Sequence, residues 1–301
     1  MRVVVTGGTG FIGSAIVRAL VPDHEVVALT RHPEAARLPG GARAARWEAM
    51  AGPPEARDLA GAGCVIHLAG EPIAAGRWSP ERKRRILESR EIGTQNLIRG
   101  LDAAGARGGV FACASAVGIY GDRGDEELDE SSAPGEGFLA DVCKSWEAAA
   151  GQVRSLGFRV INVRFGFVIG RGGGGLARML GPFRLGAGGR LGSGRQWMSW
   201  IHLADAAGLV LHALGEPRID GPLNATAPAP VTNADFTRAL GKALRRPAVL
   251  PVPRLALGLA FGEMADVLLS SQRVTPRRAL QTGYRFRHPD LGEALAEATS
   301  E

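Results

Sequence analysis

Three glycines near the N-terminus constrain the fold of this chain more than any other feature. Gly7, Gly10 and Gly13 directly follow the β-branched apolar run of residues 2–6, and residues 14–21 then carry apolar side chains at helical spacing. A strand that turns through glycines into a helix begins a βαβ unit. The first glycine permits a tight turn, the second lets a diphosphate approach the backbone, and the third lets helix and strand pack closely. Unpaired N–H groups at the helix N-terminus then face the phosphates.

The rest of the first half alternates strands and helices. We predict strands over 25–30, 64–68, 110–114 and 159–165, and helices over 80–101 and 139–156. The long helix starts at Ser79-Pro80, an N-cap residue followed by proline at the first helical position. Strands and helices that alternate at this spacing predict a parallel sheet with helices on both faces. The predicted fold class is therefore α/β, a Rossmann-type doubly wound parallel sheet with a smaller C-terminal α/β lobe for the substrate.

The end of the second predicted strand distinguishes NADP(H) from NAD(H). An acidic residue there would accept hydrogen bonds from both ribose hydroxyls of NAD and would repel a 2′-phosphate. This chain has Thr30-Arg31-His32 instead, and its next carboxylate is Glu34. The Arg31 guanidinium can bind a 2′-phosphate through paired charge-assisted hydrogen bonds, and the alternative is an exposed arginine without a ligand. We predict NADP(H) as the cofactor.

The composition of the chain changes after residue 165. The segments 170–175 and 181–194 are rich in glycine and contain arginines, and we interpret them as mobile loops. A helix near Ala204 and a short strand over 222–226 follow, and prolines interrupt the helical periodicity after Thr232. We expect residues 1–165 to form the NADP-binding Rossmann domain. Residues 166–301 should form a substrate or lid region, of which about 200–226 returns to the Rossmann sheet.

Several longer motifs resemble those of one protein family. They are Thr6-Gly7-Gly8-Thr9-Gly10-Phe11-Ile12-Gly13, Leu68-Ala69-Gly70-Glu71-Pro72-Ile73, Ser115-Ala116-Val117-Gly118-Ile119-Tyr120-Gly121 and Trp197-Met198-Ser199-Trp200-Ile201-His202. The chain is similar to the extended short-chain dehydrogenase/reductases, and within them to the atypical epimerase family proteins, also called sugar nucleotide epimerase-like. This resemblance implies NADP(H) in a cleft between a Rossmann domain and a small C-terminal lobe. With the observations above, it predicts this cofactor-binding set: Gly7, Thr9, Gly10, Phe11, Ile12, Gly13, Arg31, Leu68, Ala69, Gly70 and Arg90.

Ordinary members of that family use a Ser or Thr, a Tyr, and a Lys four residues after the Tyr. The lysine lowers the pKa of the phenol, which exchanges a proton with the substrate hydroxyl as hydride moves. Ser115 is the catalytic candidate for the first role, and the alternative is a strand-end serine bonded to backbone. The chain has only two tyrosines, Tyr120 and Tyr284, and Gly124 and His288 stand four residues after them. No Tyr-x-x-x-Lys sequence exists, so the usual proton transfer cannot operate.

The helix that should carry this pair holds other residues. If Glu147 aligns with the usual glutamate after the lysine, Leu139 takes the tyrosine position and Cys143 the lysine position. Lys144 is one residue out of register, about a hundred degrees around the helix, and we interpret it as solvated. For Tyr120 we favour packing, with its hydroxyl bonded to backbone.

Other polar residues have structural interpretations. His202 and Asp205 open a predicted helix, where capping explains them better than proton transfer. The cysteines at 64, 113 and 143 are too far apart for a disulfide framework or a zinc site, so we expect core thiols and no metal.

Composition also narrows the partners. The net charge is +6, but no basic stripe is interleaved with aromatic residues, which argues against nucleic-acid binding. The chain starts directly with a core strand and contains no apolar run long enough to span a bilayer. We therefore expect a cytoplasmic protein, without membrane contact, that acts on a small-molecule substrate. The sequence does not predict the oligomeric state.

Three functions remain open from the sequence. The first is an NADP(H)-dependent oxidoreductase with a non-standard active site, because hydride transfer requires only the cofactor and a positioned carbonyl. The second is a non-catalytic NADP(H)-binding sensor that reports cofactor occupancy to a partner. The third is a nucleotide-sugar epimerase, which normally relies on the same Tyr–Lys pair. Neither the substrate nor the direction of the reaction is predicted.

Overall fold

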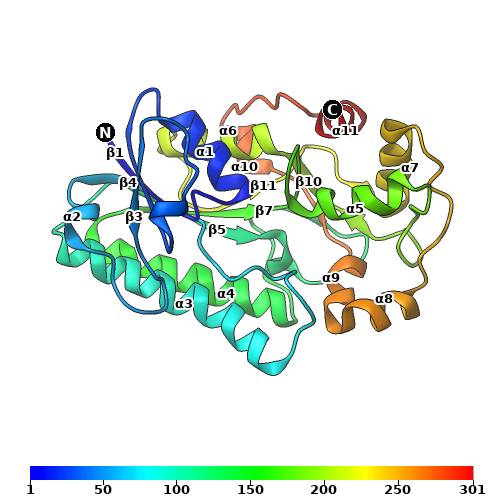
Figure 1. Ribbon diagram of the computed structural model, residues 1–301, viewed down its shortest axis with the longest axis horizontal. Coiled ribbons are helices and arrows are strands. Elements are labelled where there is room, and N and C mark those ends of the chain that lie inside the picture. The colour runs from blue at the N-terminus through cyan, green and yellow to red at the C-terminus, as the bar shows by residue number, and fades with distance from the viewer. Residues whose placement is uncertain (301) are drawn as a thin grey trace.

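Seven parallel strands form the central sheet of the computed structural model, which describes residues 1–300 (Figure 1). In spatial order they are β11 (Gly221–Ala225), β7 (Arg159–Phe165), β5 (Val110–Ala116), β4 (Ala62–His67), β1 (Arg2–Thr6), β2 (Glu25–Thr30) and β3 (Ala42–Arg46). The chain starts at β1, adds β2 and β3 on one side, and then crosses to β4 on the other. This reversal opens a crevice between β1 and β4, where open α/β sheets bind ligands. The predicted fold class is confirmed.

Helices cover both faces of this sheet (Figure 1). One face carries α1 (Phe11–Leu20) and α6 (Leu203–Gly215), and the other carries α3 (Pro80–Ala103) and α4 (Phe138–Gly151). Two short helices, α2 (Ala56–Leu59) and α10 (Arg277–Gln281), lie at the periphery. Because both faces are covered, the β1 side chains of Val3, Val4 and Val5 are fully buried. The Ser79 hydroxyl accepts a hydrogen bond from the Arg82 N–H at 3.2 Å, so α3 begins at the predicted cap.

A second hydrophobic core lies in the C-terminal half, to the right in Figure 1. It is surrounded by the helices α5 (Gly174–Arg184), α7 (Asn233–Leu244) and α11 (Leu291–Thr299). The strand pairs here are β8 (Phe167–Ile169) with β10 (Trp200–His202), β9 (Trp197–Met198) with β12 (Val231–Thr232), and β6 (Glu127–Leu128) with β13 (Arg273–Val274). The helices α8 (Arg254–Phe261) and α9 (Ala265–Leu269) complete this lobe.

Two predictions for local structure were wrong. The predicted loops 170–175 and 181–194 are partly helical, because α5 covers Gly174–Arg184. Leu176 and Phe183 are seven residues apart, lie on one face of α5, and are buried in the second core. The abundant glycines hid this spacing. The edge strand β3 was not predicted, because its alternation of alanine and arginine has low strand propensity.

No helix within residues 1–300 combines the length and the apolar composition needed to cross a membrane.

Candidate functional site

The glycine turn connects β1 to α1 and is closed by backbone contacts. Gly7 has a φ of 69°, a left-handed conformation that favours glycine, and its carbonyl accepts a hydrogen bond from the Gly10 N–H at 3.0 Å. A Cβ on Gly13 would overlap the Gly7 carbonyl oxygen and lie 2.9 Å from the Gly8 Cα. Only glycine at these positions lets the N-terminus of α1 approach the end of β1.

A crevice of about 720 Å³ opens beside this turn. It runs along the carboxyl ends of β1, β2, β3 and β4, and its volume lies in the range of small-molecule sites. The residues that line it include these members of the predicted set: Gly7, Thr9, Gly10, Arg31, Leu68, Ala69 and Gly70. Segments far apart in the sequence therefore meet at the predicted place.

The other members of the set lie outside the crevice lining. The Phe11 ring packs against Gly173 and Gly174 of the C-terminal lobe, where an added Cβ would meet it within 2.8 Å. Ile12 and Gly13 lie in the first turn of α1. Their backbone N–H groups point out of the N-terminus of the helix, and these are the groups that can face a ligand at the glycine turn. Arg90 lies beneath the segment 68–72.

Arg31 stands at the end of β2 with its side chain exposed to the crevice. Within residues 1–300 its guanidinium has neither an ion pair nor a hydrogen bond, so it is free to bind an anion. Arg37 lines the same end of the crevice and was missed in the sequence, although a second basic residue soon after β2 is a usable signal. Two carboxylates are nearby: Glu48 lines the crevice, and Glu34 lies 3.6 Å from the His32 Nδ1 atom.

A buried histidine, also missed in the sequence, supports the crevice wall. The His67 Nδ1 atom lies 2.7 Å from the Thr6 hydroxyl, and its Nε2 atom lies 2.9 Å from the Thr94 hydroxyl. The Thr6 hydroxyl oxygen accepts the N–H groups of Leu68 and Ala69 at 3.1 Å, so its own proton goes to Nδ1. Thr94 donates to the Arg90 carbonyl and therefore accepts from the imidazole Nε2–H. This neutral tautomer completes a network that holds the backbone of Leu68 and Ala69.

Burial lowers the pKa of His67 from 6.5 to about 3, with a smaller effect from the nearby Arg90 charge. Between these two values the unfolded chain binds a proton that the folded protein does not bind. The stability contribution is therefore complete above about pH 6.5 and is lost as the pH falls towards 3. We expect the unfolding free energy to fall by about 1.4 kcal/mol per pH unit in this window. Urea denaturation at several pH values measures this slope.

Two substitutions isolate the histidine in that measurement. His67→Gln removes the titrating group, so the unfolding free energy should depend less steeply on pH than in the wild-type protein. His32→Gln, at an exposed position, serves as the control and should keep the wild-type slope. Parallel slopes for wild type and His67→Gln would show that His67 does not carry the pH dependence.

Arg90 acts on the same wall from below. Its Nη1 atom donates to the Glu71 carbonyl at 3.1 Å and to the Ile86 carbonyl at 2.9 Å, and its guanidinium lies 4.8 Å from the centre of the Trp146 ring. A Cβ on Gly70 would lie 3.1 Å from the guanidinium carbon. Burial lowers the pKa of Arg90. Arg90 therefore shapes the segment that follows β4 rather than the open space of the crevice.

The Ser115 hydroxyl, at the end of β5, is part of a second buried network. It donates to the Glu147 Oε1 atom at 2.7 Å, and Ser115 is only 4% exposed. Arg164 binds both carboxylate oxygens of Glu147, at 2.8 and 2.9 Å. The Arg164 Nη1 atom also donates to the Tyr120 hydroxyl at 2.9 Å. A hydroxyl held in this way is stabilised in one orientation, with Glu147 as the acceptor of its hydrogen bond.

The remaining candidates for proton transfer are occupied or buried. The Tyr120 hydroxyl has one proton and two acceptors, the Asp129 carbonyl at 2.9 Å and the Asn224 Oδ1 atom at 2.8 Å, and burial raises its pKa. Burial also raises the pKa of Cys143. Lys144 is exposed and pairs with Asp141 at 2.6 Å. The predicted structural roles of Tyr120 and Lys144 are confirmed.

The interpretation of His202 and Asp205 as structural residues is also confirmed. His202 caps α6, because its Nδ1 atom accepts the Ala204 N–H at 3.3 Å. The buried Asp205 accepts the N–H groups of Arg287 and His288 at 2.7 and 2.8 Å, which fixes the C-terminal segment against α6. The three cysteines are free and buried, as expected for core thiols.

A sequence model described as the NAD dependent epimerase/dehydratase family matches residues 3–224. The chain belongs to this family. A second model, a domain of unknown function designated DUF1731, matches residues 252–298 of this epimerase/dehydratase family member. That range contains the helices α8 to α10 and all but the last residue of α11.

Known relatives match this family member over nearly its whole length. It is 41% identical to the epimerase family protein Mb2239 of Mycobacterium bovis, over 99% of this chain and 97% of that protein. It is 39% identical to the epimerase family protein SDR39U1 of Homo sapiens, over 99% of each. The crystal structure of human SDR39U1 isoform 2 with NADPH has a TM-score of 0.85 and 37% identity, and the match covers 99% of both chains. The resemblance inferred from the motifs is thus confirmed.

Proposed function

We propose that this chain binds NADP(H) in the crevice beside the glycine turn. The observation that carries this proposal is the unpaired Arg31 guanidinium at the end of β2, with Arg37 lining the same end. Two arginines at this point offer charge-assisted hydrogen bonds to a 2′-phosphate, which NAD(H) lacks. The structural match to a human relative crystallised with NADPH supports the same cofactor.

The other residues of the predicted set have distinct roles in this proposal. Gly7, Thr9 and Gly10 provide the close backbone approach for the diphosphate, and the N–H groups of Phe11, Ile12 and Gly13 face it at the start of α1. The segment Leu68-Ala69-Gly70 forms the opposite wall, which His67 and Arg90 hold from behind. The glycine positions have no room for a Cβ, so the residues fit a dinucleotide.

We further propose that the protein is an oxidoreductase acting on a small molecule. Bound NADP(H) supplies a hydride or an acceptor for one. In this proposal the Ser115 hydroxyl at the end of β5 binds a substrate oxygen. Ser115 is 4% exposed and lies outside the crevice lining, and its bond to Glu147 orients the hydroxyl. With Glu147 aligned to the usual glutamate, Leu139 takes the position of the usual tyrosine, so in this proposal water or a group of the substrate carries the proton.

One observation favours a second candidate function, a non-catalytic NADP(H)-binding sensor. The Ser115 hydroxyl already donates a hydrogen bond to Glu147, and the Glu147 carboxylate forms an ion pair with Arg164. A site in which every polar group has a partner can hold a cofactor without performing proton transfer. The sensor would bind NADP(H) tightly, turn over no carbonyl compound, and bind a partner only in one cofactor state.

Arg31→Ala tests the choice of cofactor. We expect the affinity for NADPH to fall by about 10- to 100-fold, because one charge-assisted interaction with the 2′-phosphate is lost. The affinity for NADH should stay unchanged, since it has no 2′-phosphate. Fluorescence titration of the purified protein with each cofactor measures both affinities. Arg18→Ala, at an exposed position on α1 away from the crevice, is the matched control. An unchanged NADPH-to-NADH ratio in Arg31→Ala would contradict the proposed role of Arg31.

A second experiment separates the enzyme from the sensor. NADPH oxidation is followed with a panel of aldehydes and ketones, at protein concentrations high enough to detect a single turnover. An oxidoreductase should consume NADPH with at least one compound and lose this activity in Ser115→Ala. Tight NADPH binding without turnover across the panel would favour the sensor. Absence of NADPH binding would contradict both functions.

A further inference from the structure

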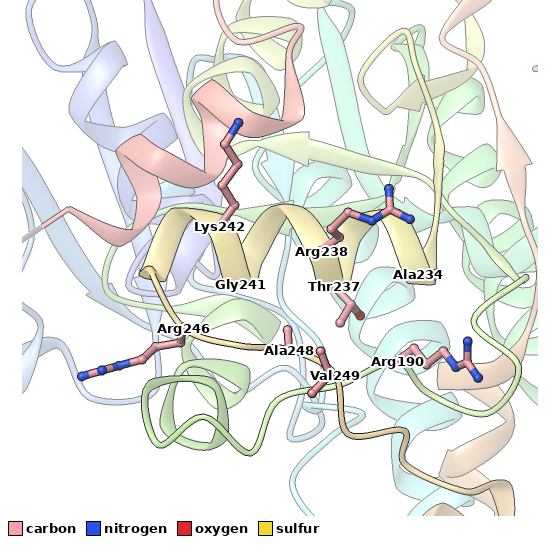
Figure 2. Close-up of a pocket in the computed structure, with 9 residues that line it drawn as sticks. All are labelled: Arg190, Ala234, Thr237, Arg238, Gly241, Lys242, Arg246, Ala248 and Val249. Atoms are coloured by element: carbon pink, nitrogen blue, oxygen red, sulfur yellow. The ribbon is translucent and has the colours of Figure 1, made fainter.

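A second cavity lies in the C-terminal lobe and shares no residue with the crevice. Its volume is about 490 Å³, within the range of small-molecule sites. It is lined by Arg190, Ala234, Thr237, Arg238, Gly241, Lys242, Arg246, Ala248 and Val249 (Figure 2). One wall is α7, and the other is formed by the chain that follows α7 together with the segment around Arg190.

The backbone around this cavity is built by specific contacts. Arg245 ends α7 with a φ of 52°, a left-handed conformation that turns the chain back along the helix. Gly241 lets this returning chain approach, because a Cβ there would lie 2.8 Å from the Ala248 Cβ. The Arg190 carbonyl accepts the Val252 N–H at 2.8 Å, which joins the second wall to the segment that carries Arg190. These contacts place α7 on one side of the cavity and the returning chain on the other.

Thr237 is the buried polar group in this cavity, and it has no partner. Its residue is only 3% exposed, and its hydroxyl has no hydrogen bond within residues 1–300. Figure 2 shows the Thr237 side chain on the side of α7 that faces Val249 and Arg190. A buried hydroxyl without a partner costs free energy, and most such groups in folded proteins are bonded. A ligand that accepts or donates one hydrogen bond at this point would satisfy it.

The charge around the cavity specifies the kind of ligand. Four cationic side chains line it, and only Arg238 has an ion-pair partner within residues 1–300, Asp235 at 2.9 Å. Figure 2 shows the charged ends of Lys242 and Arg246 extending outward at the rim. They contribute positive potential at the rim, while Arg190 lies on the same side as Thr237. A cavity that combines cationic side chains with an unpartnered hydroxyl suits phosphate oxygens, and several cations without an ion-pair partner within residues 1–300 favour an anion with more than one charge.

We propose that this cavity binds a small phosphorylated compound, with its phosphate on Arg190 and the Thr237 hydroxyl. The small apolar side chains of Ala234, Ala248 and Val249 line the remainder of the cavity and contact the less polar part of the ligand. The cavity and the crevice share no lining residue, so substitutions in the cavity leave the crevice lining unchanged.

Titration calorimetry of the full chain with inorganic pyrophosphate tests this proposal. Pyrophosphate also fits the glycine turn, so the comparison of variants decides rather than the total heat. Arg190→Gln should weaken one class of site by about tenfold or more, because it removes a charge-assisted interaction. Thr237→Val should weaken the same class by about threefold and leave the other class unchanged. Arg184→Gln, at an exposed position outside the cavity, is the matched control and should bind like wild type.

Thermal unfolding without ligand provides a second readout. Thr237→Val replaces an unpartnered hydroxyl with a methyl group of the same shape, so its Tm should equal or exceed that of the wild type. A Tm lowered by several degrees would show that the hydroxyl serves the fold, which would overturn its role as a ligand group. Pyrophosphate binding that is the same in wild type, Arg190→Gln and Thr237→Val would overturn the site itself.

Discussion

Gly13→Ala is expected to abolish NADP(H) binding under ordinary assay conditions. The added Cβ would overlap the Gly7 carbonyl oxygen and lie 2.9 Å from the Gly8 Cα, and both are backbone atoms of the turn itself. To accommodate it, α1 must move away from β1, which removes its N-terminal N–H groups from the phosphates. We expect NADPH affinity to fall by about 100-fold or more, equivalent to about 2.7 kcal/mol. Fluorescence titration with NADPH measures this loss.

A glycine elsewhere provides the control for that substitution. Gly151 ends α4, and an added Cβ would meet no atom within 4 Å. Gly151→Ala should therefore leave NADPH binding unchanged and stabilise the protein by about 0.5–1 kcal/mol, because alanine has the higher helix propensity. Circular dichroism of Gly13→Ala checks that the chain still folds. A folded Gly13→Ala protein that binds NADPH like wild type would rule out the crevice as the cofactor site.

Arg164→Met is expected to destabilise the folded protein by about 3–5 kcal/mol, a large part of the stability of a typical domain. The Arg164 and Glu147 side chains are only 7% and 13% exposed, so the substitution leaves a buried carboxylate without its cation. The Tyr120 hydroxyl loses its donor at the same time. Urea denaturation measures the change in unfolding free energy.

An exposed ion pair and a double variant provide the comparison. Arg154 pairs with Asp220 at the surface, where both side chains are 48% exposed, so Arg154→Met should cost less than about 1 kcal/mol. Adding Glu147→Gln to Arg164→Met removes the unpaired charge and should recover part of the loss. If Arg164→Met costs no more than Arg154→Met, the buried network does not stabilise the fold.

The network around Arg164 bears on function as well as stability. The chain lacks a Tyr-x-x-x-Lys pair, so the candidate hydroxyl is that of Ser115. The structure places beside it the Glu147 carboxylate, which is paired with Arg164. In the proposed oxidoreductase, Ser115→Ala removes the substrate contact and one hydrogen bond to Glu147, while both Arg164 contacts to that carboxylate remain. Its effect on turnover would report on substrate binding rather than on proton transfer.

Several features of the fold and the site were predictable because they depend on short segments. The glycine turn requires only residues 6–13, since the conformation of a tight turn and the start of a helix are decided by neighbours in the chain. The prediction of NADP(H) was based on one position, Arg31, at the end of an apolar strand. The parallel sheet followed from the alternation of apolar strands with amphipathic helices, which both repeat locally.

The features that the sequence did not reveal depend on contacts between residues far apart in the chain. The helix α5 was hidden because glycines dilute its apolar spacing, and only packing against the second core stabilises it. His67 looks like any histidine at the end of a strand. Its low pKa arises from burial, with a smaller effect from the Arg90 charge, and its hydroxyl partners Thr6 and Thr94 lie 61 and 27 residues away.

The amino-acid sequence by itself therefore determined the doubly wound class, the glycine turn, the arginine directly after β2 and the absence of a Tyr-x-x-x-Lys sequence. Only the tertiary structure decided what surrounds Ser115. Glu147 is 32 residues from Ser115 in the chain, and Arg164 is 17 residues from Glu147. The physical reason is that conformational preferences act between chain neighbours, whereas charge pairing and burial act between whichever groups the packed sheet and helices bring into contact.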